Sequence, residues 1–426
     1  MGEMQHAASL SRLSSDELHA LLQEERDQSG VVYDPRLPEL RTNPYPFFHT
    51  LRDLDPVHWS PLLAAWLLTR YHDVQTFLRQ ANLSKDFRNA RRSLLGSTGM
   101  IAPAPGLPTL LRLDPPDHTR LRSLVSKAFT PRAVEAMRPR IQTMTHDLLN
   151  GVKSGAPFDL IRELANPLPV MVIAEMLGVS AGDREQFKVW STDLALGSDV
   201  SSSDDMHARR SAAQEQLLAY FQRVLQARRH QPRDDLLSAL LAAEEEGERL
   251  TEAELLGTCM LLLVAGNETT TNLIGNGMLA LLRHPDQLQL LQREPTWMTQ
   301  AIEELLRYDS PVQMIQRLVT TETEVGGKCI TPGTMVIILI GAVNRDPDVF
   351  PNPDVLDITR NDANHVSFGY GIHYCLGAPL ARVEASIAIA TLLRRFPHVQ
   401  LMTESPVWRH SSVFRGLEAL PLLLQS

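Results

Sequence analysis

The segment FGYGIHYCLGAPLAR, residues 368–382, surrounds a single cysteine with glycines and a histidine. The glycines allow the backbone to approach another group closely. Pro379 has no N–H group and is tolerated in a first helical turn, so the sequence predicts that Cys375 stands at a helix N-terminus. There the helix dipole and free N–H groups favour a thiolate, which is a good metal ligand.

Two other interpretations of Cys375 remain open on these residues alone. A lone cysteine is more often a buried structural residue. A zinc site would need more ligands, yet no second cysteine lies at C-x-x-C spacing, and His373 does not complete a tetrahedral set.

A second reactive group lies in LLLVAGNETTTNLIGNGMLALL, residues 261–282, where apolar residues at helical spacing flank a polar centre. Gly266 costs about 1 kcal/mol relative to alanine in a helix interior. Threonine hydroxyls compete for the carbonyl groups one turn earlier, so this sequence invites a local opening. A buried carboxylate at Glu268 needs a partner or a water chain. The alternative is a polar helix face that meets water or a neighbouring loop.

The order Phe-Gly-x-Gly-x-His-x-Cys-x-Gly closely resembles the haem-binding signature of the cytochrome P450 family. The matching residues are Phe368, Gly369, Gly371, His373, Cys375 and Gly377. The resemblance implies that these residues bind haem b and that the Cys375 thiolate is the proximal ligand of its iron. Such a thiolate donates electron density that favours O–O cleavage. Cys259 and Cys329 match no ligand of the family.

The stretch AGNETT, residues 265–270, resembles the oxygen-activation motif of the same family. By this resemblance, Ala265 and Gly266 are small enough for the haem to lie against the helix. Thr269 is expected to hydrogen-bond the O2 co-substrate, and Glu268 to relay protons from solvent. Cys375 would then hold one face of the iron while this helix covers the other.

Four basic residues resemble the propionate contacts of the family. His118 and Arg122 stand at i,i+4 in DPPDHTRLR, on a helix that we expect Asp114 to cap. The resemblance implies that this pair, with Arg317 and His373, binds the haem propionates, which need cationic hydrogen-bond donors. The alternative for His118 and Arg122 is an exposed helix start.

The segment EELLR places Glu304 and Arg307 at i,i+3 on one helical face. An exposed pair of this kind contributes only about 0.2–0.5 kcal/mol. The resemblance instead implies a buried structural pair behind the haem. Glu303 is the competing acid, but Glu304 alone has the required spacing.

The chain has 426 residues, of which 43% are hydrophobic and 21% charged, a globular composition. Its net charge of -9 argues against a nucleic-acid partner. The three cysteines imply no disulfide framework, which favours the cytosol. We see no signal-peptide pattern and no apolar run long enough to span a bilayer. We therefore expect a cytoplasmic monomer with no membrane partner.

The elements that must position these residues are mostly α-helical with minor β structure. A helix over 251–283 would be roughly 50 Å long, enough to cross the molecule. Residues 312–342 read as strands, and 413–424 as a final hairpin. We expect an N-terminal helical extension over 1–30 and one large cytochrome P450-like domain over 31–426. In it, haem lies between the long central helix and the cysteine loop.

The resemblance implies a monooxygenase that uses O2 and two electrons to hydroxylate or epoxidise a hydrophobic small molecule. A terpenoid, steroid, macrolide or fatty-acid derivative is expected because the predicted pocket wall is apolar. Its residues are Met100, Ile101, Leu107, Leu262, Ala265, Met314, Ile315 and Val413. A separate ferredoxin and ferredoxin reductase are the expected electron donors.

Two alternatives for the function remain open. One is a peroxide-dependent or non-hydroxylating member of the same fold, although peroxide users do not need the intact Glu268–Thr269 pair. The other is a non-enzymatic haem sensor or carrier, which would bind haem without substrate-dependent oxygen consumption.

Overall fold

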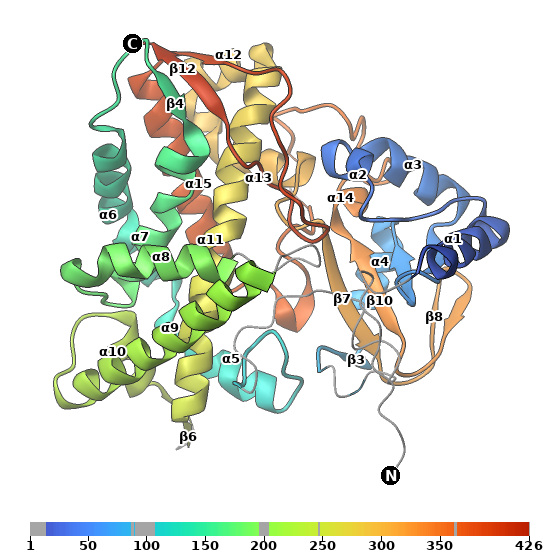
Figure 1. Cartoon of the computed structure of the whole chain (residues 1–426), viewed down its shortest axis with the longest axis horizontal. Coiled ribbons are helices and arrows are strands. Elements are labelled where there is room, and N and C mark those ends of the chain that lie inside the picture. Colours follow the sequence, from blue (N-terminus) through green and yellow to red (C-terminus); the bar gives the residue numbers. More distant parts are fainter. Residues whose placement is uncertain are drawn as a thin grey trace.

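A long central helix, α11 (Glu252–Arg283), runs through the middle of the computed structural model (Figure 1). The structure describes residues 14–86, 89, 107–195, 204–245, 248–361 and 364–425. The side chain of Thr251 caps α11 and forms a reciprocal capping box with Glu254. Pro285 begins the next helix. The helix predicted over 251–283 is thus confirmed.

Helices dominate the described chain, as the sequence predicted. The α-helices are α1 (Ser15–Ser29), α2 (Pro38–Thr42), α3 (Tyr45–Leu54), α4 (Tyr71–Leu78), α5 (Asp117–Ala128), α6 (Pro131–Leu149), α7 (Pro167–Met176), α8 (Arg184–Ala195), α9 (Asp204–His230), α10 (Leu236–Ala242), α11, α12 (Pro285–Arg293), α13 (Met298–Tyr308), α14 (Ile340–Val343) and α15 (Ala378–Arg395). Short 3-10 or π turns are η4 (Ile161–Ala165), η5 (Ala181–Asp183), η6 (Pro295–Trp297) and η7 (Gly371–His373). None of these helices is both long and apolar enough to cross a membrane.

Most helices gather on one side of the molecule, and the largest sheet lies on the other, beside α1–α4 (Figure 1). This sheet has the strand order β1-β2-β10-β7-β3 and is antiparallel except for the pair β2–β10. Its strands are β1 (Val57–Ser60), β2 (Ala65–Leu68), β3 (Leu83–Ser84), β7 (Met314–Val319) and β10 (Met335–Leu339). The strands predicted within 312–342 are therefore confirmed.

The C-terminal strand differs from the prediction. A second sheet has the order β11-β12-β4, with β4 (Pro157–Asp159), β11 (His398–Leu401) and β12 (Pro421–Gln425). The last strand thus pairs with residues distant in sequence, so the hairpin predicted within 413–424 is wrong. Two small ribbons pair β5 (Glu244–Glu245) with β6 (Glu248–Arg249) and β8 (Thr323–Val325) with β9 (Lys328–Ile330).

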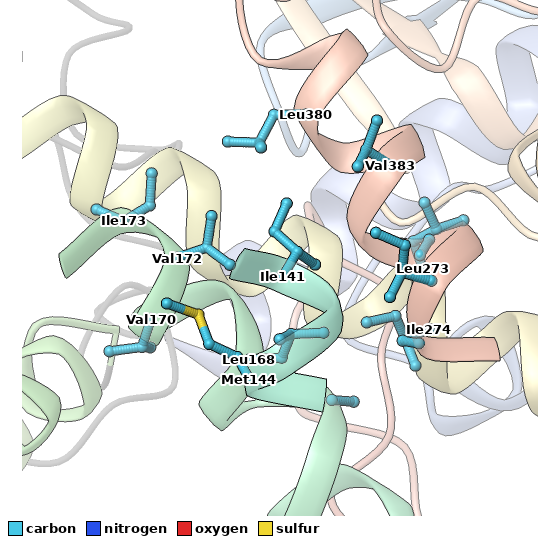
Figure 2. Close-up of a cluster of buried hydrophobic side chains, with 14 of the residues drawn as sticks. Ile141, Met144, Leu168, Val170, Val172, Ile173, Leu273, Ile274, Leu380 and Val383 are labelled. Atoms are coloured by element: carbon cyan, nitrogen blue, oxygen red, sulfur yellow. The ribbon is translucent and has the colours of Figure 1, made fainter. Parts of the chain in front are cut away.

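The main hydrophobic core holds α11 against α6, α7 and α15 (Figure 2). Leu273 and Ile274 of α11 pack in the same cluster as Ile141 of α6, Ile173 of α7 and Val383 of α15. Each such side chain contributes about 1.5–3 kcal/mol when fully buried. The core therefore fixes α11 relative to the helix that follows Cys375.

The N-terminal helix α1 is joined to the sheet by a buried polar contact. Ser14 and Glu17 form a capping box at its start, and Gly30 ends the helix with a positive φ of 75°. The Glu25 carboxylate lies 2.7 Å from Nε2 of the buried His58 on β1. The domain boundary at residue 30 stays a prediction.

Glu384 lies in α15 and is only 2% exposed. Its Oε2 atom has no hydrogen-bond partner in the described structure. Burial raises the pKa of this carboxyl from 4.5 to about 8, because burial disfavours the charged form. The folded protein therefore holds a proton here that the unfolded chain releases near pH 4.5.

We predict that Glu384→Gln reduces the loss of stability between pH 5 and 8. Because the folded pKa is raised, the contribution of Glu384 to stability is complete below pH 4.5 and is lost as the pH rises toward 8. The wild type should lose a few kcal/mol more than the variant across this window. Urea unfolding at both pH values measures the difference, with Glu135→Gln as the exposed control. Equal pH slopes in all three proteins would contradict the prediction.

Candidate functional site

The loop before α15 folds back on itself around Cys375. The Cys375 N–H donates to the Phe368 carbonyl over 2.9 Å. Gly369 and Gly371 have φ of 74° and 72°, a left-handed conformation that glycine adopts without steric cost. The helix begins at Ala378. The predicted position of the cysteine immediately before a helix is therefore confirmed.

Gly377 needs a different explanation. Its φ is -83°, which any residue adopts, and an added Cβ would meet no protein atom within 4 Å. Neither backbone strain nor protein packing therefore requires glycine here. Close approach of a non-protein group beside Cys375 remains as a physical reason, and it fits the cofactor expected from the sequence.

The sulfur of Cys375 lacks a sufficient opposing charge from the protein. The residue is exposed on one side, yet the surrounding protein raises the pKa of its thiol. The backbone N–H groups of Gly377 and Ala378 and the Arg122 guanidinium act in the opposite direction but do not outweigh this desolvation. An ionised sulfur here therefore needs a cation, such as a metal ion. Among the described residues, no group of three or more His, Cys, Asp or Glu could hold a metal.

One face of α11 is open although most of the helix is buried. Ala265 is exposed, and Leu262, Gly266 and Thr269 are half-buried. Their spacing of three, four and seven residues places them on one face. This stripe of small and apolar residues around Thr269 suits a flat, apolar group against the helix.

The polar centre of α11 keeps its helical form. The Thr269 hydroxyl donates to the Ala265 carbonyl over 2.9 Å, so the predicted competition for carbonyl groups occurs. It does not interrupt the helix, which is continuous from Glu252 to Arg283. An added Cβ at Gly266 would lie 3.2 Å from Cδ1 of Ile173. Packing against α7 therefore explains this glycine, and its role toward haem stays a prediction.

Glu268 has the partner that its burial demands. Its Oε1 lies 3.4 Å from Nη1 of Arg409, which comes from the C-terminal part of the chain. The sequence predicted that a partner or water chain would exist but gave no means of naming Arg409.

Basic side chains meet beside the cysteine loop. The rings of His118 and His373 have centroids 4.2 Å apart. His118 is 1% exposed, and neither of its ring nitrogens has a hydrogen-bond partner in the described part of the chain. Arg317, on β7, is 6% exposed, and burial lowers its pKa to about 10. The structure therefore brings together residues predicted from three separate segments.

The positive charges in this cluster repel one another. Burial, together with repulsion from Arg317, His118, Lys85 and Arg122, lowers the pKa of His373 to about 2. Burial also lowers the pKa of Lys85 well below its ordinary range, again with Arg317 contributing. Such a cluster is suited to bind anionic groups, since its basic side chains would gain charge-assisted hydrogen bonds. The residues thus fit the two carboxylates of a haem.

Asp114 does not have its predicted role as a helix cap. Helix α5 begins at Asp117, and no side chain caps it. The Asp114 carboxylate instead accepts from the Lys85 N–H over 2.7 Å and from the Ser84 hydroxyl. It therefore ties β3 to the start of α5, a long-range contact that local sequence patterns do not reveal.

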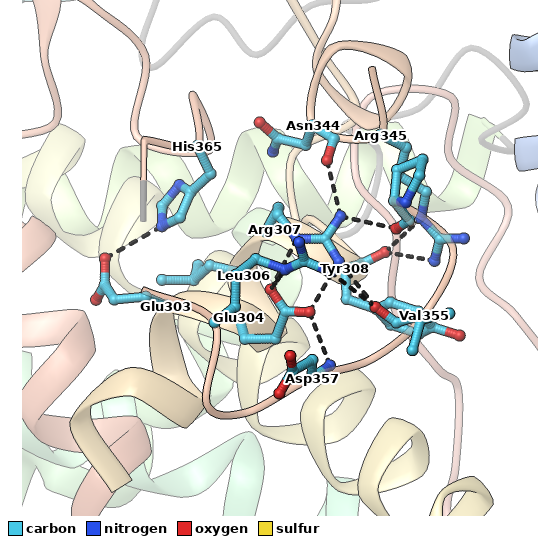
Figure 3. Close-up of polar contacts among 12 residues, drawn as sticks. Glu303, Glu304, Leu306, Arg307, Tyr308, Asn344, Arg345, Val355, Asp357 and His365 are labelled. Atoms are coloured by element: carbon cyan, nitrogen blue, oxygen red, sulfur yellow. Dashed lines mark hydrogen bonds and ion pairs between the residues drawn. The ribbon is translucent and has the colours of Figure 1, made fainter. Parts of the chain in front are cut away.

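Glu304 and Arg307 form the buried pair that the sequence predicted (Figure 3). Both side chains are 1% exposed, and two parallel hydrogen bonds of 2.7 and 2.8 Å join them. The remaining Arg307 donors reach the carbonyls of Asn344, Pro353 and Val355. The pair thus anchors the segment after β10 to α13.

Glu303 makes a separate connection to the helix that follows the cysteine. Its carboxylate accepts from Arg382 over 2.6 and 2.8 Å. It also lies 3.1 Å from Nε2 of His365 (Figure 3). Burial alone would raise its pKa, but the hydrogen bonds from Arg382 and His365 lower the pKa to about 2. The Arg382 guanidinium also lies 4.5 Å from the ring centre of Phe368. Neighbouring acids in EELLR therefore secure different segments around the loop.

The predicted pocket residues do not form one continuous wall. Met100 and Ile101 lie outside the described residues. Met314 and Ile315 are adjacent on β7 and therefore point to opposite faces of the sheet. Met314 is a buried core residue, in the same cluster as Val413, whereas Ile315 packs against the cluster on the other face. Met314 and Ile315 thus cannot line the same surface.

Of the remaining pocket residues, Ala265 lies on the open face of α11 described above, and Leu107 and Leu262 lie against or within the same helix. Leu107 is close to Gly257, where an added Cβ would lie 3.5 Å from the Leu107 Cβ. Leu262 lies on the open face of α11 and is half-buried. Both lie on the helix side of the molecule, and their contact with substrate stays a prediction.

Comparison with known proteins identifies the family. A family model described as Cytochrome P450 matches residues 101–412. The chain belongs to the cytochrome P450 family. It is 44% identical over 388 residues to the vitamin D(3) 25-hydroxylase of Pseudonocardia autotrophica, covering 90% of this chain and 94% of that protein. Family membership makes the chain a monooxygenase and implies a haem iron cofactor.

Solved structures of cytochromes P450 share the fold. The bacillaene polyketide synthase cytochrome P450 PksS of Bacillus subtilis has a TM-score of 0.85 and 39% identity, covering 93% of this chain and all of that one. P450BioI, in complex with an acyl carrier protein that carries hexadec-9Z-enoic acid, has a TM-score of 0.82 and 39% identity. That match covers 91% of this chain and 99% of P450BioI.

Three basic residues of the site, Lys85, Arg382 and Arg409, were not predicted from the sequence. Arg382 had a usable signal, because it lies one turn beyond Ala378 on the helix after the cysteine. Lys85 and Arg409 had none, because each reaches the site through tertiary contacts with segments distant in sequence.

We predict that Arg307→Ala destabilises the protein by about 3–5 kcal/mol, because it leaves the Glu304 carboxylate without its main partner in the interior. Arg138→Ala is the matched control: Arg138 also pairs with a glutamate at i,i+3, Glu135, but both side chains are exposed. The control should change stability by less than about 0.5 kcal/mol. Denaturant unfolding of both variants measures the difference, and similar losses would contradict the prediction.

Proposed function

We propose that this protein is a haem-thiolate monooxygenase that holds haem b through the Cys375 sulfur. The observation that carries the proposal is that two groups lacking an opposite charge, a thiol and a basic cluster, lie close together. Cys375 needs a cation, and the neighbouring cluster of His118, Arg122, Arg317 and His373 needs anions. Haem iron and the two haem propionates meet both.

When bound, the haem supplies the electron-transfer and oxygen-activating chemistry. Cys375 would hold the haem iron through its sulfur, and the basic cluster would bind the propionates. Phe368, Gly369 and Gly377 would shape the backbone that approaches the cofactor beside the sulfur. The open stripe of Leu262, Ala265 and Thr269 would contact the cofactor from α11.

The protons are handled by α11. Glu268 is a positioned acid that takes protons arriving from solvent, and the Thr269 hydroxyl passes them toward O2. The hydrogen bond of Thr269 to the Ala265 carbonyl holds its hydroxyl on the open face of the helix. Proton delivery of this kind supports an enzyme driven by O2 and electrons over one driven by peroxide.

We further propose a hydrophobic substrate, such as a terpenoid, steroid, macrolide or fatty-acid derivative, which the enzyme hydroxylates or epoxidises. The apolar open face of α11 supports this class. The names of a vitamin D(3) hydroxylase and a polyketide-synthase cytochrome P450 among the relatives also support it. Electrons are to come from a separate ferredoxin and its reductase, in the cytoplasm, to a monomeric enzyme.

We predict that the reduced protein under carbon monoxide shows the Soret band typical of thiolate-ligated iron. Cys375→His should shift this band to the position typical of histidine ligation, because the sulfur is the proposed ligand. Absorption spectroscopy of the haem-loaded proteins makes the measurement. A histidine-type spectrum in the wild type, or an unchanged spectrum in the variant, would contradict the assignment. Cys329→His is the control and should leave the band unchanged.

Turnover then separates the proposal from its rivals. A monooxygenase should consume O2 in a substrate-dependent way with a ferredoxin and reductase. Turnover with hydrogen peroxide but none with the ferredoxin system would favour the peroxide-dependent alternative. Haem binding with no substrate-dependent oxygen consumption across a panel of the four substrate classes would favour a sensor or carrier.

We predict that Arg317→Gln speeds the loss of haem by about 10- to 100-fold, since a hydrogen bond to a charged group contributes about 1.5–3 kcal/mol. Transfer of haem to an excess of a haem-free globin measures the rate. Arg138→Gln, at an exposed position on α6, should leave the rate unchanged. A wild-type rate in Arg317→Gln would remove this residue from the proposed propionate site.

A further inference from the structure

The C-terminal loop, residues 408–417, lies directly on α11. Its two ends pair through Trp408 and Leu417. The Asn276 side chain donates to the Arg415 carbonyl over 2.9 Å. At Gly416 the approach is closer still, because an added Cβ would lie within bonding distance of the Asn272 side chain. The loop therefore covers the face of α11 that carries residues 268, 272 and 276, each one turn apart.

Arg409 connects this loop to the acid of α11. Its Nε donates to the Leu417 carbonyl over 3.2 Å, and its backbone N–H donates to Gly416 over 2.9 Å. The far end of the guanidinium lies 3.4 Å from the Glu268 carboxylate. The loop backbone thus fixes the direction in which Arg409 reaches Glu268.

A surface cleft that is open to solvent is lined in part by the same loop. Its polar lining includes Arg41, Gln313, Arg409, Ser411 and Ser412. Arg409 is therefore the side chain shared by the cleft and Glu268.

The loop wall of this cleft is held in place by Arg415. Its Nε donates to the Asp309 carboxylate over 2.6 Å, and its Nη2 donates to the Thr42 carbonyl over 3.0 Å. These bonds join the C-terminal loop to the segment that forms the facing wall. The cleft is thus part of the packed fold.

Several buried amide atoms near this loop have no hydrogen-bond partner among the described residues. Asn272 is 1% exposed, and neither polar atom of its side chain has a partner within the described chain. The Oε1 of Gln313, in the cleft, and the Oδ1 of Asn276 are in the same condition. A buried amide atom without a hydrogen bond costs about 1–3 kcal/mol, and bound water removes this cost. Asn272 and Asn276 lie one and two turns beyond Glu268 on the same face of α11, where bound water would satisfy their free amide atoms.

We propose that the cleft is the entry for the protons that the reaction consumes, and that Arg409 is a positioning residue that holds Glu268 at its inner end. The inference rests on the proposed monooxygenase function. Overall, the substrate, O2, two electrons and two protons give the oxygenated product and water. Each proton moves from water in the cleft to the Glu268 carboxylate. It then passes inward by way of Thr269, which returns Glu268 to its ionised form.

Charge substitution at Arg409 tests the positioning role. In Arg409→Gln we expect kcat to fall about tenfold, while KM changes less than about twofold. This loss is smaller than the roughly 10²- to 10⁴-fold that a positioned acid contributes, because Glu268 itself is retained. The solvent isotope effect on kcat and the share of electrons lost to hydrogen peroxide should both rise. Arg409→Lys should restore most of kcat because it keeps the charge, and the exposed Arg162→Gln is the control. Wild-type kcat, isotope effect and coupling in Arg409→Gln would overturn the proposal.

Blocking the cleft tests the route. Ser412→Phe places a large side chain in the cleft, and it should lower kcat and raise the solvent isotope effect with the haem spectrum unchanged. Ser405→Phe, on an exposed part of the same C-terminal segment, should have no effect. Normal turnover and a normal isotope effect in Ser412→Phe would overturn the assignment of this cleft.

A readout that does not depend on turnover tests the contact itself. The melting temperatures of Arg409→Gln, Glu268→Gln and the double variant of the haem-loaded protein form a double-mutant cycle. If the two side chains are paired, the decrease in melting temperature of the double variant should be smaller than the sum of the decreases in the two single variants. Additive shifts would overturn the contact.

The wild type distinguishes this inference from the function on which it rests. Without a thiolate-type spectrum and substrate-dependent oxygen consumption in the wild type, the proposed function itself fails. With both present, wild-type behaviour in the Arg409 and Ser412 variants overturns only the proton route.

Discussion

The site depends on an electrostatic mismatch that the protein does not resolve by itself. The thiol of Cys375 is surrounded by protein that raises its pKa. A short distance away, His118, Arg317 and His373 crowd together although repulsion and burial oppose their charged forms. Such an arrangement costs stability unless a ligand neutralises both halves. The haem that we propose would neutralise both halves, which would account for the convergence of residues from α5, β7 and the cysteine loop.

The two ion pairs of α13 hold the cysteine loop and the basic cluster in a fixed position relative to each other. Arg307 is fully occupied by Glu304 and by backbone carbonyls, so it fixes the chain that leads from β10 toward the cysteine loop. Glu303 reaches the other way, to Arg382 on α15. Buried ion pairs are weak sources of net stability but hold a specific geometry when every donor is satisfied. Here they hold the loop from both sides without occupying the site.

Sequence patterns correctly predicted the features that depend only on the spacing of residues within one helix or strand. The bounds of α11, the start of α15 after Cys375 and the Glu304–Arg307 pair all follow from spacing within one element. The failures involve tertiary placement. Asp114 has the residue type of a cap but bonds to Lys85 and Ser84. Met314 is apolar like Ile315 but lies on the opposite face of β7. Arg409 reaches Glu268 only because the C-terminal loop folds onto α11.

The polar residues at the centre of α11 lie on two different faces of the helix, and each face has its own contacts. Thr269 belongs to the open face with Ala265, whereas Glu268 belongs to the face that meets the C-terminal loop with Asn272 and Asn276. Successive residues of a helix point about 100° apart, so in the proposed mechanism a proton would cross from one face to the other over a single residue. A purely apolar helix would pack better at this point, but it would separate the proposed oxygen-binding face from solvent. The proposed proton transfer would therefore account for the poor helix formers in a buried, continuous helix.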